Sequence, residues 1–208
     1  MVVIDASDTQ PGAEPAAAER RVVDALLRCV ARWGLTKTTL DDVAREAGCS
    51  RATVYRLFPG GRDAIVLRTV EREIARFHAG LAASVRDLDD LEEVVVAGVS
   101  HAARFLRDHD ALRFLIAHEP EVLLPRIAFS HMSDLLRVAS SRAAPLLAPF
   151  VGPAEAPRAA EWLARIVLSY EMAPDASVDL CDGTSVRRLV RDFVLPGLVT
   201  GAASRTRT

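Results

Sequence analysis

Aromatic residues are scarce in this 208-residue chain, at 5% of positions, although half of all residues are hydrophobic. The apolar content is carried mainly by alanine, valine and leucine, a composition that favours helix over sheet here. No apolar run is long enough to span a bilayer, and the N-terminus lacks the basic-then-apolar order of a signal peptide. We therefore expect a soluble, cytoplasmic protein of one or two small domains.

Cysteine is also rare. Cys29, Cys49 and Cys181 are odd in number and far apart, which argues against a disulfide framework or a zinc knuckle. The five histidines form no HExxH or other close metal pattern. Neither a glycine-rich phosphate loop after a strand nor a Ser-His-Asp or Cys-His pairing is evident. The sequence therefore favours a binding protein without a metal or cofactor over an enzyme.

Residues 35–65 have the pattern of two short helices joined by a tight turn. Thr39 can cap the first helix, and Gly48 suits its left-handed end because glycine adopts positive φ without a Cβ penalty. Ser50 can cap the second helix, whose apolar stripe begins at Val54. Helices this short cannot bury a core alone, so neighbouring helices must support them. The pattern predicts a helix-turn-helix, whose second helix enters the major groove of DNA.

Positive charge is concentrated in the same region. The whole chain has a net charge of −2, but residues 20–68 hold ten basic and five acidic side chains. Residues 1–19 contain four acidic side chains and no basic one, and residues 69–208 are also net negative. A basic region that coincides with a helix-turn-helix is the electrostatic pattern expected of a protein that binds DNA phosphates.

These residues resemble the TetR family of bacterial transcriptional regulators over about the first third of the chain. The family pattern is Thr-Thr-x-x-(Asp)-Val/Ile-Ala-x-x-Ala-Gly-x-Ser-x-x-Thr-Val/Leu-Tyr-x-x-Phe. It is matched at Thr38, Thr39, Asp42, Val43, Ala44, Ala47, Gly48, Ser50, Thr53, Val54, Tyr55 and Phe58. The chain departs from the family after Phe58, where it has Pro59, Gly60 and Gly61 before a cation, Arg62. The family commonly has one or two small residues and then lysine.

Position on the helices and the resemblance together define candidate DNA-contacting residues. They are Thr39, Ser50, Arg51, Ala52, Thr53, Tyr55, Arg56 and Arg62. Arg51 is the best candidate for a bidentate contact to guanine, because a guanidinium matches the O6 and N7 edge. By resemblance, Thr39 and Tyr55 are phosphate anchors, which position a protein on DNA without reading its sequence. The alternative for Tyr55 is that it only packs within the domain.

Apolar periodicity predicts an all-α protein of about nine helices. Besides the two short helices, we predict helices at about 15–33, 63–85, 88–107, 111–118, 125–147, 156–172 and 185–199. Pro, Gly or Asp residues mark the breaks. We expect a disordered leader over residues 1–14, a DNA-binding domain over 15–62, a ligand-binding and dimerisation domain over 63–199 and a disordered tail over 200–208.

The resemblance also implies an apolar cavity in the C-terminal body, with a few polar groups that orient a ligand. The candidate lining residues are Phe105, Phe114, Leu115, His118, Phe129 and Met132. Taken singly, an aromatic at helical spacing is more often part of the core. Because few charged residues fall on the inward stripes, we expect a neutral or amphipathic ligand such as a lipid-like or acyl compound.

Related bodies dimerise by pairing their last two helices into a four-helix bundle. Here Trp162, Ile166, Tyr170, Leu189 and Phe193 would form that interface. We therefore predict a homodimeric regulator, most often a repressor, which binds a palindromic operator and is released by a small molecule. Three alternatives stay open: an activator, a repressor that answers to a partner protein, and a helical receptor or enzyme with a vestigial DNA-binding head.

Overall fold

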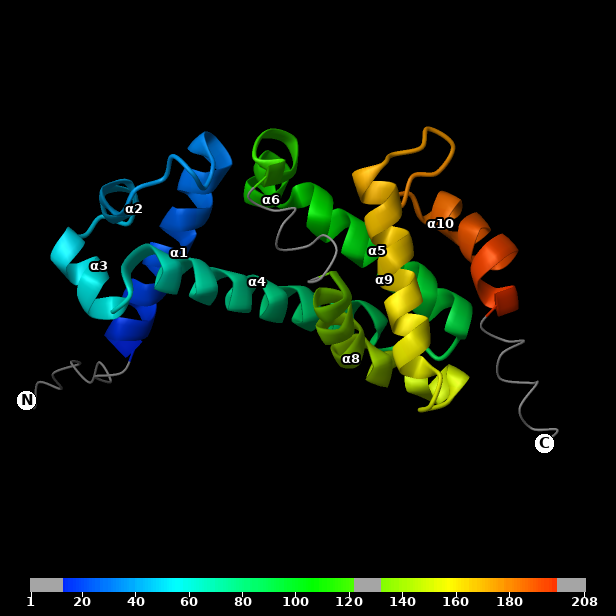
Figure 1. Ribbon diagram of the computed structural model, residues 1–208. Coiled ribbons are helices and arrows are strands. Elements are labelled where there is room, and N and C mark those ends of the chain that lie inside the picture. Colours follow the sequence, from blue (N-terminus) through cyan, green and yellow to red (C-terminus); the bar gives the residue numbers. More distant parts are fainter. Residues whose placement is uncertain (1–12, 122–131, 198–208) are drawn as a thin grey trace, which may run out of the picture.

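The computed structural model describes residues 13–121 and 132–197. Apart from one isolated β-bridge, the secondary structure of those residues is helical, which confirms the predicted all-α class. The helices are α1 (Ala13–Trp33), α2 (Leu40–Glu46), α3 (Arg51–Leu57), α4 (Gly61–Val85), α5 (Leu91–Asp108), α6 (Asp110–His118), α8 (Met132–Val151), α9 (Ala156–Met172) and α10 (Gly183–Leu189), which continues into a π-helical turn (Val190–Val194) (Figure 1). The predicted leader up to residue 12, the predicted helix start at residue 125 and the predicted tail lie outside the described residues.

Most helix ends fall close to their predicted positions, and α8 is the main exception. The predicted end at Leu147 is wrong, because α8 continues to Val151 through Pro145 and Pro149. Proline lacks the N–H that would bond four residues back, so each costs the helix a hydrogen bond. Leu147 and Val151 are nevertheless buried in the body core, where α8 packs along much of α9. Packing between the two helices therefore maintains α8 beyond its prolines.

The N-terminal head is a small core built by α1, α2 and α3 with the first turns of α4. From α1 it buries Val22, Val23, Leu26, Cys29 and Val30, which recur at helical spacing. Val54 and Phe58 from α3 and Ile65 from α4 complete it. Cys29 is fully buried here as a small apolar residue, and burial raises the pKa of its thiol.

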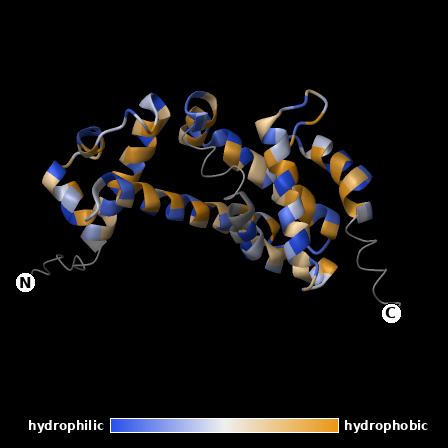
Figure 2. Ribbon diagram, viewed as in Figure 1, coloured by the Kyte–Doolittle hydropathy of each residue, from blue (hydrophilic) through white to orange (hydrophobic). Residues whose placement is uncertain are grey.

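Helix α4 connects the head to the body, as Figure 1 shows. Ile65, near its start, is buried in the head core, whereas Leu81 and Val85 are buried at its other end. The colours of Figure 2 show polar and apolar residues alternating along the helix, as expected for a helix that packs on one side. Because one continuous helix joins both cores, a displacement of its body end also moves the head.

The body consists of α5, α8, α9 and α10 packed around a valine-rich core. Three consecutive residues of α5, Val94, Val95 and Val96, are buried, and so are residues of the last helix spaced four apart, such as Val186 and Val190. Within the described residues, each helix is too short or too polar to cross a membrane.

Helix α6 follows α5 but turns back to the head. Its Ala111 is buried in the head core, and Leu115 packs against the same cluster. The helix lies mainly along α1. The head is therefore attached to the body through α4 and α6 together.

Candidate nucleic-acid interface

Local capping signals fix the helix-turn-helix. The Thr39 hydroxyl accepts a hydrogen bond from the Asp42 N–H at 3.2 Å, and the Asp42 carboxylate accepts one from the Thr39 N–H at 3.0 Å. This reciprocal pair is a capping box at the start of α2. Gly48 has φ +67° in the turn, and the Ser50 hydroxyl caps α3 by accepting from the Thr53 N–H at 3.1 Å. Each of these roles follows from residue type and spacing.

Helix α3 presents most of the predicted DNA-contacting residues to solvent. Val54 and Phe58 face the head core, and Thr53 is half-buried beside them. The exposed residues are Thr39, Ser50, Arg51, Ala52, Tyr55 and Arg56. Tyr55 is 45% exposed, which is more than a residue used only for core packing would show.

Arg51 is held at the surface by two neighbours. Its guanidinium lies 3.2 Å from the Asp41 carboxylate and 3.4 Å from the Tyr55 hydroxyl oxygen. It also lies 5.6 Å from the centre of the Tyr55 ring. The hydrogen bond to Tyr55 and the charge of Asp41 raise the pKa of Arg51 above its usual value. A guanine or phosphate contact by Arg51 would have to displace Asp41.

We therefore expect Asp41→Asn to bind DNA more tightly than the unchanged protein. The substitution removes a competing acceptor for Arg51 and a negative charge that faces the phosphates. An exposed ion pair contributes up to about 1 kcal/mol, so the gain is at most roughly fivefold at low salt. Titration of a labelled operator at two salt concentrations measures it, and the gain should shrink as salt rises. Asp89→Asn, an equal charge change at an exposed position between α4 and α5, is the control. Equal effects of both substitutions would contradict a specific role for Asp41.

The structure places Arg62 differently from the other candidates. Its guanidinium is half-buried and donates a hydrogen bond to the backbone carbonyl of Leu35. Its Nε is buried and has no hydrogen-bond partner among the described residues. Arg62 is thus engaged inside the protein rather than presented with Arg51 and Arg56.

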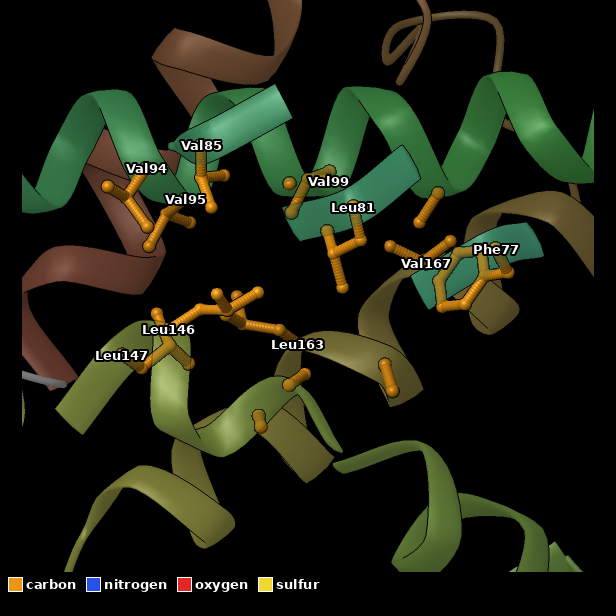
Figure 3. Close-up of a pocket in the computed structure, with 15 residues that line it drawn as sticks. Phe77, Leu81, Val85, Val94, Val95, Val99, Leu146, Leu147, Leu163 and Val167 are labelled. Carbon is orange, nitrogen blue, oxygen red and sulfur yellow. The ribbon is translucent and has the colours of Figure 1, made fainter. Parts of the chain in front are cut away.

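An apolar cavity of about 110 Å³ lies in the body between α4, α5, α8 and α9. Figure 3 shows Phe77 and Leu81 of α4, Val95 and Val99 of α5 and other labelled side chains around the cavity. The full lining is Phe77, Leu81, Val85, Val94, Val95, Gly98, Val99, Ala102, Ala143, Leu146, Leu147, Ala160, Leu163, Ala164 and Val167. None of these side chains has a polar group, so the cavity suits an apolar ligand.

The predicted ligand-binding residues whose side chains the structure describes do not line this cavity. The Phe105 ring lies 5.2 Å, between ring centres, from that of Phe77, which does line the cavity. Phe114 and His118 lie instead in a more polar groove between α1 and α6, and Leu115 packs on the head core. Phe129 lies outside the described residues, and Met132 is the first residue of α8, with a side chain that is not described. Sequence reasoning missed the valines and alanines of the wall, whose spacing resembles that of any buried helix.

The predicted dimer residues occupy an apolar face that is partly exposed. Trp162 of α9 is 40% exposed, and Phe193 of the π-helical turn is 70% exposed. Ile166, Tyr170 and Leu189 are half-buried and pack at the edge of the body core. An exposed phenylalanine and tryptophan on the last two helices are the kind of surface that a partner covers.

The fold and the exposed face of α3 define a helix-turn-helix DNA-binding protein. Residues 22–69 match the family model of the bacterial regulatory proteins of the tetR family. The chain is 28% identical to an uncharacterized HTH-type transcriptional regulator of Mycobacterium tuberculosis, over 90% of this chain and 88% of that protein. It is 24% identical to the regulator BetI of Brucella suis, over 84% of this chain and 88% of that protein.

Solved structures agree on the fold. The TetR family repressor AlkX from Dietzia, implicated in biodegradation of n-alkanes, superposes with a TM-score of 0.61 at 22% identity, over 88% of this chain and 95% of that one. The fatty acid degradation regulator FadR from Bacillus halodurans also gives 0.61, at 18% identity, over 83% of this chain and 93% of that one. Over residues 22–69 the chain therefore has the DNA-binding helix-turn-helix of the tetR family, and its fold agrees with that of solved TetR family regulators.

Proposed function

We propose that this regulator is a homodimeric repressor that binds a palindromic operator and releases it when a small apolar effector fills the body cavity. In this proposal residues 15–62 bind DNA, and residues 63–199 bind the effector and dimerise. The observation that carries it is the wholly apolar lining of a cavity whose wall includes α4, the helix that also enters the head.

The lining supports an alkyl chain as the effector's main feature. A carboxylate or phosphate inside the cavity would find no charged or hydrogen-bonding side chain among the lining residues, and its burial would be costly. A charged head group must therefore stay outside, or the effector must be uncharged. The names of two structural neighbours, which refer to n-alkanes and to fatty acid degradation, agree with this chemical class.

The size of the cavity suggests how the effector acts. An engineered cavity of about 150 Å³ in another protein binds benzene, so the 110 Å³ here must expand to admit a longer chain. Expansion displaces Phe77 and Leu81, and with them α4. Binding then favours a form in which the head is shifted, and operator affinity falls by the same coupling factor.

The dimer follows from the exposed apolar face and from the needs of DNA binding. One head reads only a few base pairs, so two heads on a palindrome are needed for useful affinity. We expect Phe193→Glu to convert the dimer to monomers, because the new charge would be buried at the interface. Sedimentation measures whether the variant is a dimer or a monomer. Phe150→Glu would not serve as a control, because Phe150 packs on the body core. Leu67→Glu, at an exposed apolar residue of α4 outside the proposed interface, is the control. A dimer that survives Phe193→Glu would place the interface elsewhere.

The experiment that tests the proposal has two steps. Purified protein captures fragmented genomic DNA at low salt, and sequencing identifies the enriched sites. Decane, decanoic acid and a polar control, glycerol, are then tested for release of the captured site. Palindromic sites upstream of genes, released by the alkyl compounds alone, support the proposal. No enrichment with folded dimeric protein would contradict DNA binding and favour a receptor or enzyme with a vestigial head.

A further inference from the structure

A buried carboxylate joins the body to the head. Glu119 follows the last residue of α6 and is only 7% exposed. One carboxylate oxygen accepts a hydrogen bond from the Leu35 N–H at 2.7 Å, and both oxygens lie 3.2 Å from the Thr36 nitrogen as acceptors of its N–H. These amides belong to the loop between α1 and α2, which leads directly into the helix-turn-helix.

Helix α4 binds the other side of the peptide unit that joins Leu35 to Thr36. The Arg62 guanidinium, in the first turn of α4, donates to the Leu35 carbonyl. The Thr38 hydroxyl, also buried, donates to the Gly34 carbonyl at 2.6 Å and closes the loop on itself. The backbone of Leu35 is therefore bound by α6 and by α4 at once.

The contact is too tight to admit an extra atom. Gly34 has φ +83°, which disfavours any side chain, and a Cβ there would lie 2.3 Å from a Glu119 oxygen and 2.9 Å from the Phe114 ring. The end of α6 is thus fitted against the loop by both hydrogen bonding and shape. A shift of α6 cannot leave this loop in place without breaking bonds to Glu119.

We propose that Glu119 is a positioning residue for DNA binding, which sets the orientation of the helix-turn-helix relative to the body through the amides of Leu35 and Thr36. This inference rests on the proposed function. Helix α6 continues from α5, which supplies part of the cavity wall. The state of the body therefore reaches the start of α2 through α6 and Glu119, in parallel with α4.

The test compares Glu119→Gln with Glu121→Gln, an equal change at an exposed residue two positions further on. A glutamine oxygen in the place of the carboxylate oxygen that faces both amides can still accept from them, but the NH₂ group then opposes the Thr36 N–H and the negative charge is lost, so the contact with the loop is weakened. Amide hydrogen exchange in the dimer measures the strength of this contact without DNA. The exchange rates at Leu35, Thr36 and α2 should increase in Glu119→Gln and stay unchanged in Glu121→Gln. Should Glu119→Gln fail to fold, Glu119→Asp retains the charge with a shorter reach.

The second readout separates positioning from simple destabilisation. Affinity is measured for captured operators whose half-sites are moved apart by one or two base pairs. Glu119→Gln should lose on the order of tenfold at the natural spacing, a coupling of ordinary size, and much less at altered spacings, with base preference inside each half-site unchanged. An equal loss at every spacing, or unchanged exchange of the two amides, overturns the proposal. If the unchanged protein captures no DNA, the proposed function fails, and the Glu119 contact is judged by exchange alone: slow amides in the unchanged protein and fast ones in the variant still support it.

Discussion

Arg51→Ala is expected to weaken operator binding by about 1–3 kcal/mol, roughly 5- to 150-fold, and to relax base preference at one position of each half-site. Arg51 is exposed at the start of α3, where its guanidinium can reach a base edge once Asp41 is displaced. The loss should be concentrated on operators with guanine at the contacted position. Binding to altered operators that already lack this guanine should change much less.

Arg51→Lys is the matched variant for that prediction. Lysine keeps the positive charge and its attraction to phosphates but lacks the planar fork that pairs with guanine. Affinity for a panel of operators with each base pair changed in turn distinguishes the two contributions. Base preference should relax in both variants, while the alanine variant alone loses one unit of charge and part of the salt dependence. Unchanged base preference in the lysine variant would assign Arg51 to phosphate contact.

Ala164→Leu is expected to abolish most of the response to alkyl compounds while leaving operator binding intact. Residue 164 lines the cavity from α9, so three added carbon atoms occupy space that the effector needs. Each methylene group kept out of the cavity forfeits about 0.8 kcal/mol, so exclusion of two weakens effector binding on the order of tenfold. Overpacking also costs stability, typically about 1–3 kcal/mol, which thermal unfolding records separately.

Two controls sharpen this prediction. Ala83→Leu adds the same atoms on the exposed side of α4 and should leave the response unchanged. We compare the unchanged protein, Ala164→Leu and Ala83→Leu by the concentration of decanoic acid that releases half of the bound operator. A normal response in Ala164→Leu would mean that the effector binds elsewhere, and the groove between α1 and α6 that contains Phe114 and His118 would be examined next.

The helix-turn-helix was predictable because its signals are local. The capping box of Thr39 and Asp42, the positive φ of Gly48 and the cap of Ser50 depend on residues at most three positions apart. The segregation of charge added a second, independent signal. The predicted range 156–172 equals the observed bounds of α9, since Pro157 lies at its start and Pro174 follows its end.

The cavity and the head–body contact were not predictable because they depend on where α6 goes. Aromatic residues in and near α6 suggested a ligand site there, but Ala111 and Leu115 instead attach that helix to the head core. The partner of Glu119 lies more than eighty residues earlier in the chain, and the carbonyl bound by Arg62 lies 27 residues away. Nothing in residue spacing brings such distant groups together.

The two prolines of α8 bear on which effectors the proposed site could accept. Leu146 and Leu147 line the cavity between Pro145 and Pro149, in a stretch that lacks two of the usual main-chain hydrogen bonds. Proline is a common cause of helix bending, so this wall can change its curvature without breaking bonds that the other walls would have to give up. The cavity is therefore more easily deformed on the side of α8 than on its other sides. In the proposed mechanism, an effector that is accommodated by bending α8 would displace Phe77 and Leu81 of α4 less, and it would therefore release DNA less effectively.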